Sequence, residues 1–281
     1  MAVSSKTPVE LSIEPRNLRF QSSFGESRWW LKGDPIATAV FNALSATFPE
    51  GERKFIESVA FFRDMVDQPL RGQIKAFVRQ EANHTREHLA FNAHVADAGY
   101  ETCRIEARTR ESADRSRGKP PVVQLAATSA LEHFTAVLSH QLLADPSLLD
   151  GAPPEIQRLW RWHAVEEIEH KAVAYDTFLA VTKRLGAFRR WRLRVLVMAV
   201  VSLQFSRSMI ANVADLLEQD GLEPRRMRGR ALAYLFGRPG ILRRALPHYL
   251  SYYLPGFHPW QCKDQELARA ADVALGEAAP A

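Results

Sequence analysis

Residues 160–176, WRWHAVEEIEHKAVAYD, place metal-binding side chains at helical spacing. If this segment is a helix, His163, Glu167 and His170 stand at i, i+4 and i+7, so two imidazoles and a carboxylate project from one stripe. A surface helix scatters such groups around its circumference, and a core helix has Leu or Ile at these positions. The segment therefore predicts a set of metal ligands on one helix face.

A second segment repeats the Glu-x-x-His spacing. One pair alone carries little weight, because chance gives roughly 0.6 such pairs in a chain of this composition. Glu81 and His84 form the second pair, and two other predicted core helices hold one glutamate each, Glu52 and Glu132. The order Glu, Glu-x-x-His, Glu, Glu-x-x-His on four successive helices is the ligand arrangement of ferritin-like bundles that bind two iron or manganese ions. The predicted metal ligands are Glu52, Glu81, His84, Glu132, His163, Glu167 and His170.

The rest of the sequence predicts an all-α fold. Ala, Leu, Arg and Glu are frequent, strand-like alternation is rare, and 46% hydrophobic residues in a 281-residue chain suffice for a large core. We expect a ferritin-like four-helix bundle with additional C-terminal helices over 34–260, a loose N-terminal arm over 1–33 and a frayed tail over 261–281. The predicted helices are 35–48, resuming over 52–66 after Pro49 and Gly51, then 70–98, a short exposed 101–118, 122–143, 154–185 and 188–219.

The residue types also indicate which ions the site binds. Carboxylates are hard oxygen donors that can bridge two cations, and imidazoles complete each coordination shell, a mixture that suits iron or manganese. Four buried carboxylates would repel one another strongly unless bound cations compensated their charge. We therefore expect two iron ions, with manganese or a mixed pair as alternatives, and zinc if the protein is a hydrolase.

Several of these residues also have ordinary structural interpretations. Glu52 would open a helix after a break, where the helix dipole favours a carboxylate. His163 is either a third imidazole ligand or a packed histidine, and His88 either supports a ligand or is exposed. Glu166 and Glu169 flank the ligand stripe and are expected to face solvent or to pair with arginine.

Charge and cysteine content limit the classes of partner. The formal net charge is +5, and arginines cluster late, over 184–194 and 225–230, without a nucleic-acid-binding motif, so we expect no nucleic acid partner. The apolar run 195–203 is shorter than the roughly 18 residues of a membrane span, which favours a packing helix over membrane contact. Two cysteines and no secretory signal favour a cytoplasmic protein, with a homodimer as an open alternative.

These motifs resemble those of two known families. The spacing of His163, Glu167 and His170 resembles that of the di-iron N-oxygenases that oxidise arylamines. A broader resemblance, over about 34–260, is to the bacterial family of predicted metal-dependent hydrolases, and it implies a ferritin-like metal-binding bundle. The segments that carry it are FPEGERKFIESV (48–59), QEANHTREH (80–88), LEHFTA (131–136), WHAVEEIEHKAVAYD (162–176) and PGFHPW (255–260).

The function predicted first is oxidation, in which two metal ions activate O2 to oxidise a small, apolar or aromatic substrate. The alternative is hydrolysis, in which the same metals activate a bridging water that attacks an ester, amide or phosphoester. A third interpretation is an iron-handling or scaffold bundle without turnover. Dependence of turnover on O2 separates the first two, and absence of turnover identifies the third.

Overall fold

The computed structural model describes residues 6–8, 11–20, 24–25 and 27–277. Every regular element in these residues is helical, which confirms the all-α prediction. The α-helices are α1 (Pro35–Ala60), α2 (Leu70–Asp97), α3 (Cys103–Arg117), α4 (Pro121–Ala144), α5 (Pro154–His170), α6 (Val173–Val181), α7 (Ala187–Gln219), α8 (Pro224–Leu232), α9 (Ile241–Ser251) and α10 (Gln265–Glu277). The connections include the 3-10 turns η1 (Arg63–Met65), η2 (Pro146–Leu149) and η4 (Pro259–Gln261) and the π-helical turn η3 (Ala233–Gly237).

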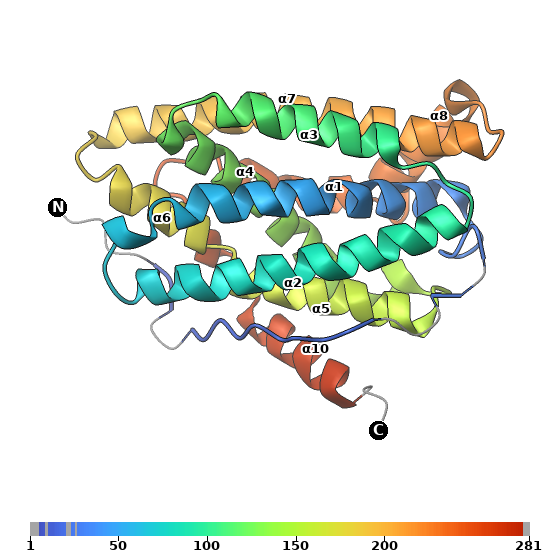
Figure 1. The fold of residues 1–281 in the computed structure, drawn as a ribbon, viewed down its shortest axis with the longest axis horizontal. Coiled ribbons are helices and arrows are strands. Elements are labelled where there is room, and N and C mark those ends of the chain that lie inside the picture. Colours follow the sequence, from blue (N-terminus) through green and yellow to red (C-terminus); the bar gives the residue numbers. More distant parts are fainter. Residues whose placement is uncertain (1–5, 9–10, 21–23, 26, 278–281) are drawn as a thin grey trace.

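Four helices form the centre of the molecule. α1 packs against α2 and α4, and α5 packs against α4 and α2, so inward-pointing side chains from all four can meet (Figure 1). α3 and α7 lie along one side of this core, at the upper edge of Figure 1, and α10 packs against α5 at the lower edge. The more specific likeness to ferritin-like bundles stays a prediction.

α1 is a single helix through Pro49, so the predicted break between residues 48 and 52 is wrong. It begins as expected, with the Asp34 carboxylate accepting from the first backbone N–H groups and Pro35 in the first turn. Pro49 lacks an N–H and leaves the Ser45 carbonyl without its helical donor. Asn92 of α2 supplies that donor, because its Nδ2 lies 3.2 Å from the Ser45 oxygen. A side chain from a neighbouring helix thus compensates the proline.

The predicted helix over 154–185 is divided in two, and the break follows His170 directly. At the turn between α5 and α6, Lys171 is buried and donates to the Cys262 carbonyl and the Asp264 carboxylate. The C-terminal segment is therefore attached next to the end of α5. A pattern of helical spacing alone does not reveal this tertiary contact.

The described residues of both terminal segments pack against the bundle more closely than expected. Phe20 is fully buried, with its ring 5.3 Å from that of Trp162, and Trp30 donates to Asn42 of α1, so the arm is not loose over its described residues. α10 buries Ala268 and Leu275, so the tail is helical rather than frayed as far as Glu277, and 278–281 lie outside the described residues. The boundaries at 33 and 260 stay predictions.

α7 has its predicted bounds to within one residue, but its apolar stretch is longer than the predicted run 195–203. By length and composition it could cross a membrane, and only 17% of its most apolar 18-residue stretch is buried. The sequence led us to expect an apolar run too short for a membrane span, and that expectation is wrong, because an 18-residue stretch of α7 meets the length and composition criterion. The structure nevertheless keeps α7 against α1, α3 and α4, as the packing prediction states.

Candidate metal centre

The seven predicted ligands meet between α1, α2, α4 and α5. Each is at most 4% exposed, although all are ionisable, and burial of so many charged groups requires compensation. Their donor atoms form overlapping groups in which all atoms lie within 4.8 Å of one another. One group is Glu81, Glu132 and His170; a second is Glu52, Glu81 and His84; a third is His84, His163 and Glu167; a fourth joins Glu52, His163 and His88.

Two of these groups share one carboxylate. Glu81 belongs both to the group that contains His170 and to the group that contains His84. Glu167 Oε1 lies 3.5 Å from His170 Nε2 and 3.5 Å from His84 Nδ1, so it also stands between the two histidines. Two carboxylates therefore lie between the two imidazoles, a donor set that suits a pair of cations.

Unsatisfied atoms provide a test of whether metals fit this site. Buried polar atoms normally have hydrogen-bond partners, because an unpaired one costs about 1–3 kcal/mol. Eight donor atoms of the seven residues have no such partner: Glu52 Oε1, both oxygens of Glu81, His84 Nδ1, both oxygens of Glu132, Glu167 Oε2 and His170 Nε2. Carboxylate and imidazole donors left free in this number suit two divalent cations of the iron, manganese or zinc type.

His84 is oriented by a buried carboxylate. Its Nε2 donates to Glu166 Oε2 at 2.9 Å, since a carboxylate can only accept, and Nδ1 therefore faces the site. A carboxylate behind a ligand histidine fixes its tautomer and makes it a stronger donor to metal. Burial lowers the pKa of His84, but Glu166, Glu167 and Glu81 raise it to about 10.

His170 is oriented by a neutral amide. Gln80 Nε2 donates to Glu169 Oε2 at 2.9 Å, which places Gln80 Oε1 against His170 Nδ1, also at 2.9 Å. His170 Nδ1 must therefore carry the proton, and its Nε2 faces the carboxylates of Glu81 and Glu132. Burial lowers the pKa of His170, but Glu167 and Glu132 raise it well above its ordinary value.

A hydrogen-bonded chain fixes the tautomer of His163. Asn92 Nδ2 donates to the Ser45 carbonyl, so Asn92 Oδ1 accepts the Ser45 hydroxyl proton at 2.6 Å. Ser45 has no second proton, and His88 Nδ1 therefore donates to Ser45 Oγ at 2.9 Å. His88 Nε2 in turn accepts from His163 Nδ1 at 2.8 Å. Burial and the charge of His84 lower the pKa of His163 to about 4, so its Nε2 carries a lone pair.

Three imidazole nitrogens therefore surround one carboxylate oxygen. Glu167 Oε1 lies 3.2 Å from His163 Nε2, in addition to its 3.5 Å contacts with His84 and His170. Burial raises the pKa of Glu167, but the surrounding imidazoles lower it well below its ordinary value. Without a metal ion, protons on His84 and His170 balance the negative charge of Glu167.

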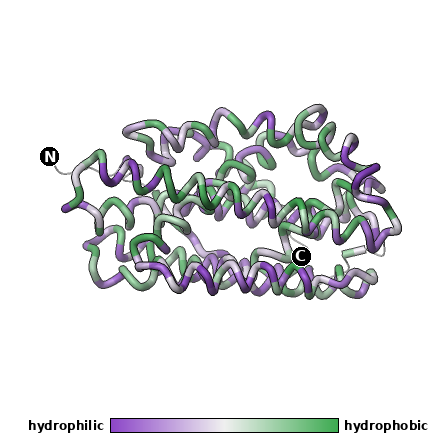
Figure 2. Tube along the Cα trace, turned by 90° about the horizontal axis from the view of Figure 1, so that it is seen from above, coloured by the Kyte–Doolittle hydropathy of each residue, from purple (hydrophilic) through white to green (hydrophobic). Residues whose placement is uncertain are grey.

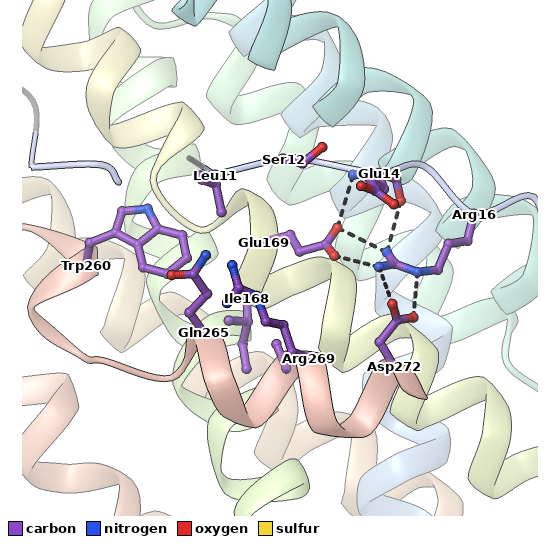
Figure 3. A pocket seen from close by; sticks show the side chains of 11 residues that line it. Leu11, Ser12, Glu14, Arg16, Ile168, Glu169, Trp260, Gln265, Arg269 and Asp272 are labelled. Atoms are coloured by element: carbon purple, nitrogen blue, oxygen red, sulfur yellow. Dashed lines mark hydrogen bonds and ion pairs between the residues drawn. The ribbon is translucent and has the colours of Figure 1, made fainter. Parts of the chain in front are cut away.

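The N-terminal segment supports both Glu-x-x-His pairs through one residue. The Arg16 backbone N–H donates to Glu166 Oε1 at 2.7 Å, and its guanidinium binds Glu169 and Asp272 (Figure 3). Glu166 orients His84, and Glu169 orients Gln80, which holds His170. Arg16 therefore connects the N-terminal segment and α10 to the surroundings of two histidines, beside a pocket of about 190 Å³.

The structure decides several open interpretations. Glu52 lies far inside α1, so it does not open a helix, and Thr85 Oγ1 donates to its Oε2 at 2.9 Å. Glu169 and Glu166 both pair with arginine as expected, since the Arg16 guanidinium lies 2.6 Å from Glu169 and 3.6 Å from Glu166, although Glu166 is fully buried. His88 is likewise buried, with no exposed role. The ligand assignments themselves stay predictions, since proximity alone does not demonstrate a bound ion.

Four residues that support the histidines are not among those predicted from the sequence: Gln80, Asn92, Ser45 and Arg16. Gln80 precedes Glu81 directly, and only the helix register would have shown that it lies beside the ligand stripe. Asn92 lies eight residues after His84 on α2 and Ser45 seven residues before Glu52 on α1, so helical spacing places both on the ligand stripes, whereas the approach of Arg16 depends on the tertiary fold. A separate group, His140, His248 and Cys262, lies outside this cluster and is partly exposed.

Comparison with known proteins gives one match. Neither the curated proteins nor the solved structures compared with the chain include a significant match. The family described as predicted metal-dependent hydrolase matches residues 14–263, which include the N-terminal Arg16, all seven clustered residues and the turn after α9. This match supports the hydrolytic alternative better than O2 activation. The chain belongs to the predicted metal-dependent hydrolase family.

Proposed function

We propose that the protein is a hydrolase that uses two divalent metal ions held between α1, α2, α4 and α5. The observation that supports this proposal is the set of eight unpartnered donor atoms in a buried cluster of carboxylates and imidazoles. The metals would be held by Glu81, Glu132, Glu167 and the histidines His84, His163 and His170. When bound, such ions lower the pKa of water and polarise a carbonyl or phosphoryl oxygen.

We assign proton transfer to Glu52. Thr85 holds its Oε2, and its Oε1 has no partner, so one oxygen can accept a proton while the other stays fixed. Burial and the nearby Glu81 raise the pKa of Glu52 well above its ordinary value, which makes this carboxylate a better proton acceptor than an exposed glutamate. In an oxidative site, Glu52 would instead serve as a metal ligand.

A surface pocket of about 260 Å³ supplies a route of approach. It is lined by residues of α1, the end of α3 and the start of α4, including Ser58 and Arg117. Ser58 Oγ lies 2.6 Å from Thr128 Oγ1, and Thr128 stands one helical turn before Glu132. We propose that the substrate enters here, and that the buried surroundings of the cluster exclude bulk water.

The test combines metal analysis with turnover. Protein purified without added metal should contain two equivalents, and Glu81→Gln should lose them while keeping the helical content. Hydrolysis of a panel of chromogenic esters and phosphoesters should proceed equally with and without O2. Less than one equivalent of metal, or hydrolysis unchanged in Glu81→Gln, would refute the proposal.

A second candidate is the activation of O2. The donors that form the cluster are at most 4% exposed, and such enclosure suits a small diatomic reactant better than a bulky ester. It predicts that ferrous protein consumes O2 and changes colour in air. Zinc or manganese occupancy without O2 consumption would exclude it.

A further inference from the structure

One face of α7 is apolar and exposed. Phe188, Leu196, Val200, Leu203 and Ile210 are each more than half exposed. At 100° per residue, these five side chains fall within about a third of the helix circumference, so they form one continuous stripe. We call this stripe the α7 face. Monomeric proteins seldom leave so regular an apolar stripe uncovered.

The opposite side of α7 attaches it firmly to the bundle. Met198 and Leu216 are fully buried, and the Arg194 guanidinium donates to the carbonyl groups of Tyr252 and Leu254. Near its other end, Asp215 forms an ion pair with Arg108 of α3. Because α7 is held along its length, it can lie on a membrane surface but cannot span the bilayer without leaving the fold.

Basic side chains lie on and beside the apolar stripe. Arg192 and Arg207 are exposed and fall on the α7 face itself, and Arg189 and Arg190 lie in its first turn. None of these four forms an ion pair with an acidic side chain of the described residues. Residues 183–254 contain 14 basic and 4 acidic residues, a formal charge of +10, although the whole chain carries +5. The remainder of the chain is therefore net acidic.

The neighbouring helix α9 also exposes apolar side chains. α9 exposes Leu242, Leu246 and Leu250 at i, i+4 and i+8, and its Tyr249 hydroxyl lies 2.9 Å from Ser202 Oγ of α7. Seen from the side on which α7 lies, hydrophobic and hydrophilic residues are interleaved along the helices (Figure 2). Apolar side chains among arginines are the composition of helices that bind in the interface of anionic membranes.

We propose that the α7 face binds the surface of a membrane that contains anionic lipids. The leucines would enter the boundary between headgroups and acyl chains, and Arg192 and Arg207 would pair with lipid phosphates. A second copy of this chain fits the same face less well. A two-fold interface would bring the arginines of one copy against those of the other, and Glu218, at the C-terminal edge of this face, is the one acidic residue that α7 offers there to pair with them.

Vesicle flotation of the full-length protein tests this proposal, which does not depend on the proposed enzymatic function. The probes are vesicles of phosphatidylcholine alone and of phosphatidylcholine mixed with phosphatidylglycerol. Wild-type protein should float with the anionic vesicles, and less so in high salt. Arg192→Gln with Arg207→Gln should weaken binding about thirtyfold, because each basic residue at an anionic surface contributes about a factor of five.

The apolar part has a matched control. Leu196→Ser with Leu203→Ser should weaken binding by about tenfold or more, since both side chains would enter the apolar layer. Leu89→Ser, at a similarly exposed leucine of α2, should leave binding unchanged. Failure of the wild-type protein to float would overturn the proposal. A wild-type dimer that Leu196→Ser with Leu203→Ser splits, without vesicle binding, would also overturn it and assign the face to a second copy.

Discussion

Replacing Glu166 by Gln tests whether this carboxylate orients His84 to bind a metal ion. The carboxylate accepts from two donors, the Arg16 backbone N–H at 2.7 Å and His84 Nε2 at 2.9 Å. An amide has one oxygen, so Gln can satisfy one donor and must turn its NH2 toward the other. His84 then loses the charged acceptor that fixes its tautomer. Changes to groups of this kind typically reduce metal affinity 10–100-fold, or about 1.4–2.7 kcal/mol.

The measurement is a competition titration with a chromophoric zinc chelator, which separates the two binding steps. Glu166→Gln should weaken one binding constant 10–100-fold and leave the other nearly unchanged, because His170 is held separately through Gln80. Glu155→Gln, also on α5, is the matched control, since Glu155 only pairs with Arg158. Two unchanged binding constants in a correctly folded Glu166→Gln variant would show that Glu166 does not orient a metal ligand.

Three further outcomes follow from the same geometry. Glu132→Gln should abolish one metal equivalent without lowering the stability of the metal-free protein, because burial raises the pKa of this carboxyl group, neither oxygen makes a hydrogen bond, and its ion-pair contact with His170 is long, at 3.4 Å; a large loss of metal-free stability in urea would contradict this. Asn92→Leu should cost about 1–3 kcal/mol in urea unfolding, since it leaves the Ser45 carbonyl beside Pro49 without a donor, and an unchanged midpoint would refute that role. Metal affinity should rise with pH over the neutral range, because His84, with a pKa of about 10, is protonated there and must release a proton to solvent when the metal binds; calorimetry in buffers of different ionisation enthalpy should detect that proton, and no release would contradict the assignment.

Helix register was the part of the fold that the sequence determined best. The spacing of Glu81 with His84, and of Glu167 with His170, requires only that two helices form, and helical periodicity is a local property. Helix ends were less predictable where they depended on partners. Pro49 does not interrupt α1, because Asn92 from a distant segment replaces its missing N–H.

The surroundings of the candidate site were harder to predict than its donors. Glu166 and Glu169 look alike in sequence, each one residue before another site residue, and both contact Arg16, yet Glu166 is fully buried behind His84 whereas Glu169 lies nearer the surface. The difference arises from the N-terminal segment, which was expected to be loose. Its approach depends on long-range contacts, such as that of Phe20 with Trp162, that no local pattern encodes.

The three histidines differ in what supports them, and this difference makes the two candidate metal positions unequal. His84 donates to a carboxylate, His170 to an amide and His163 to another imidazole. A charged acceptor increases the electron density of an imidazole more than a neutral one does, so His84 should be the strongest donor of the three. All three histidines contact Glu167, but it groups most closely with His84 and His163, whereas His170 groups with Glu81 and Glu132. One position therefore has two imidazoles, of which one is strongly basic, and the other has one imidazole with more carboxylate character. By ligand preference, the first should fill first with zinc or iron, and the second should accept manganese more readily.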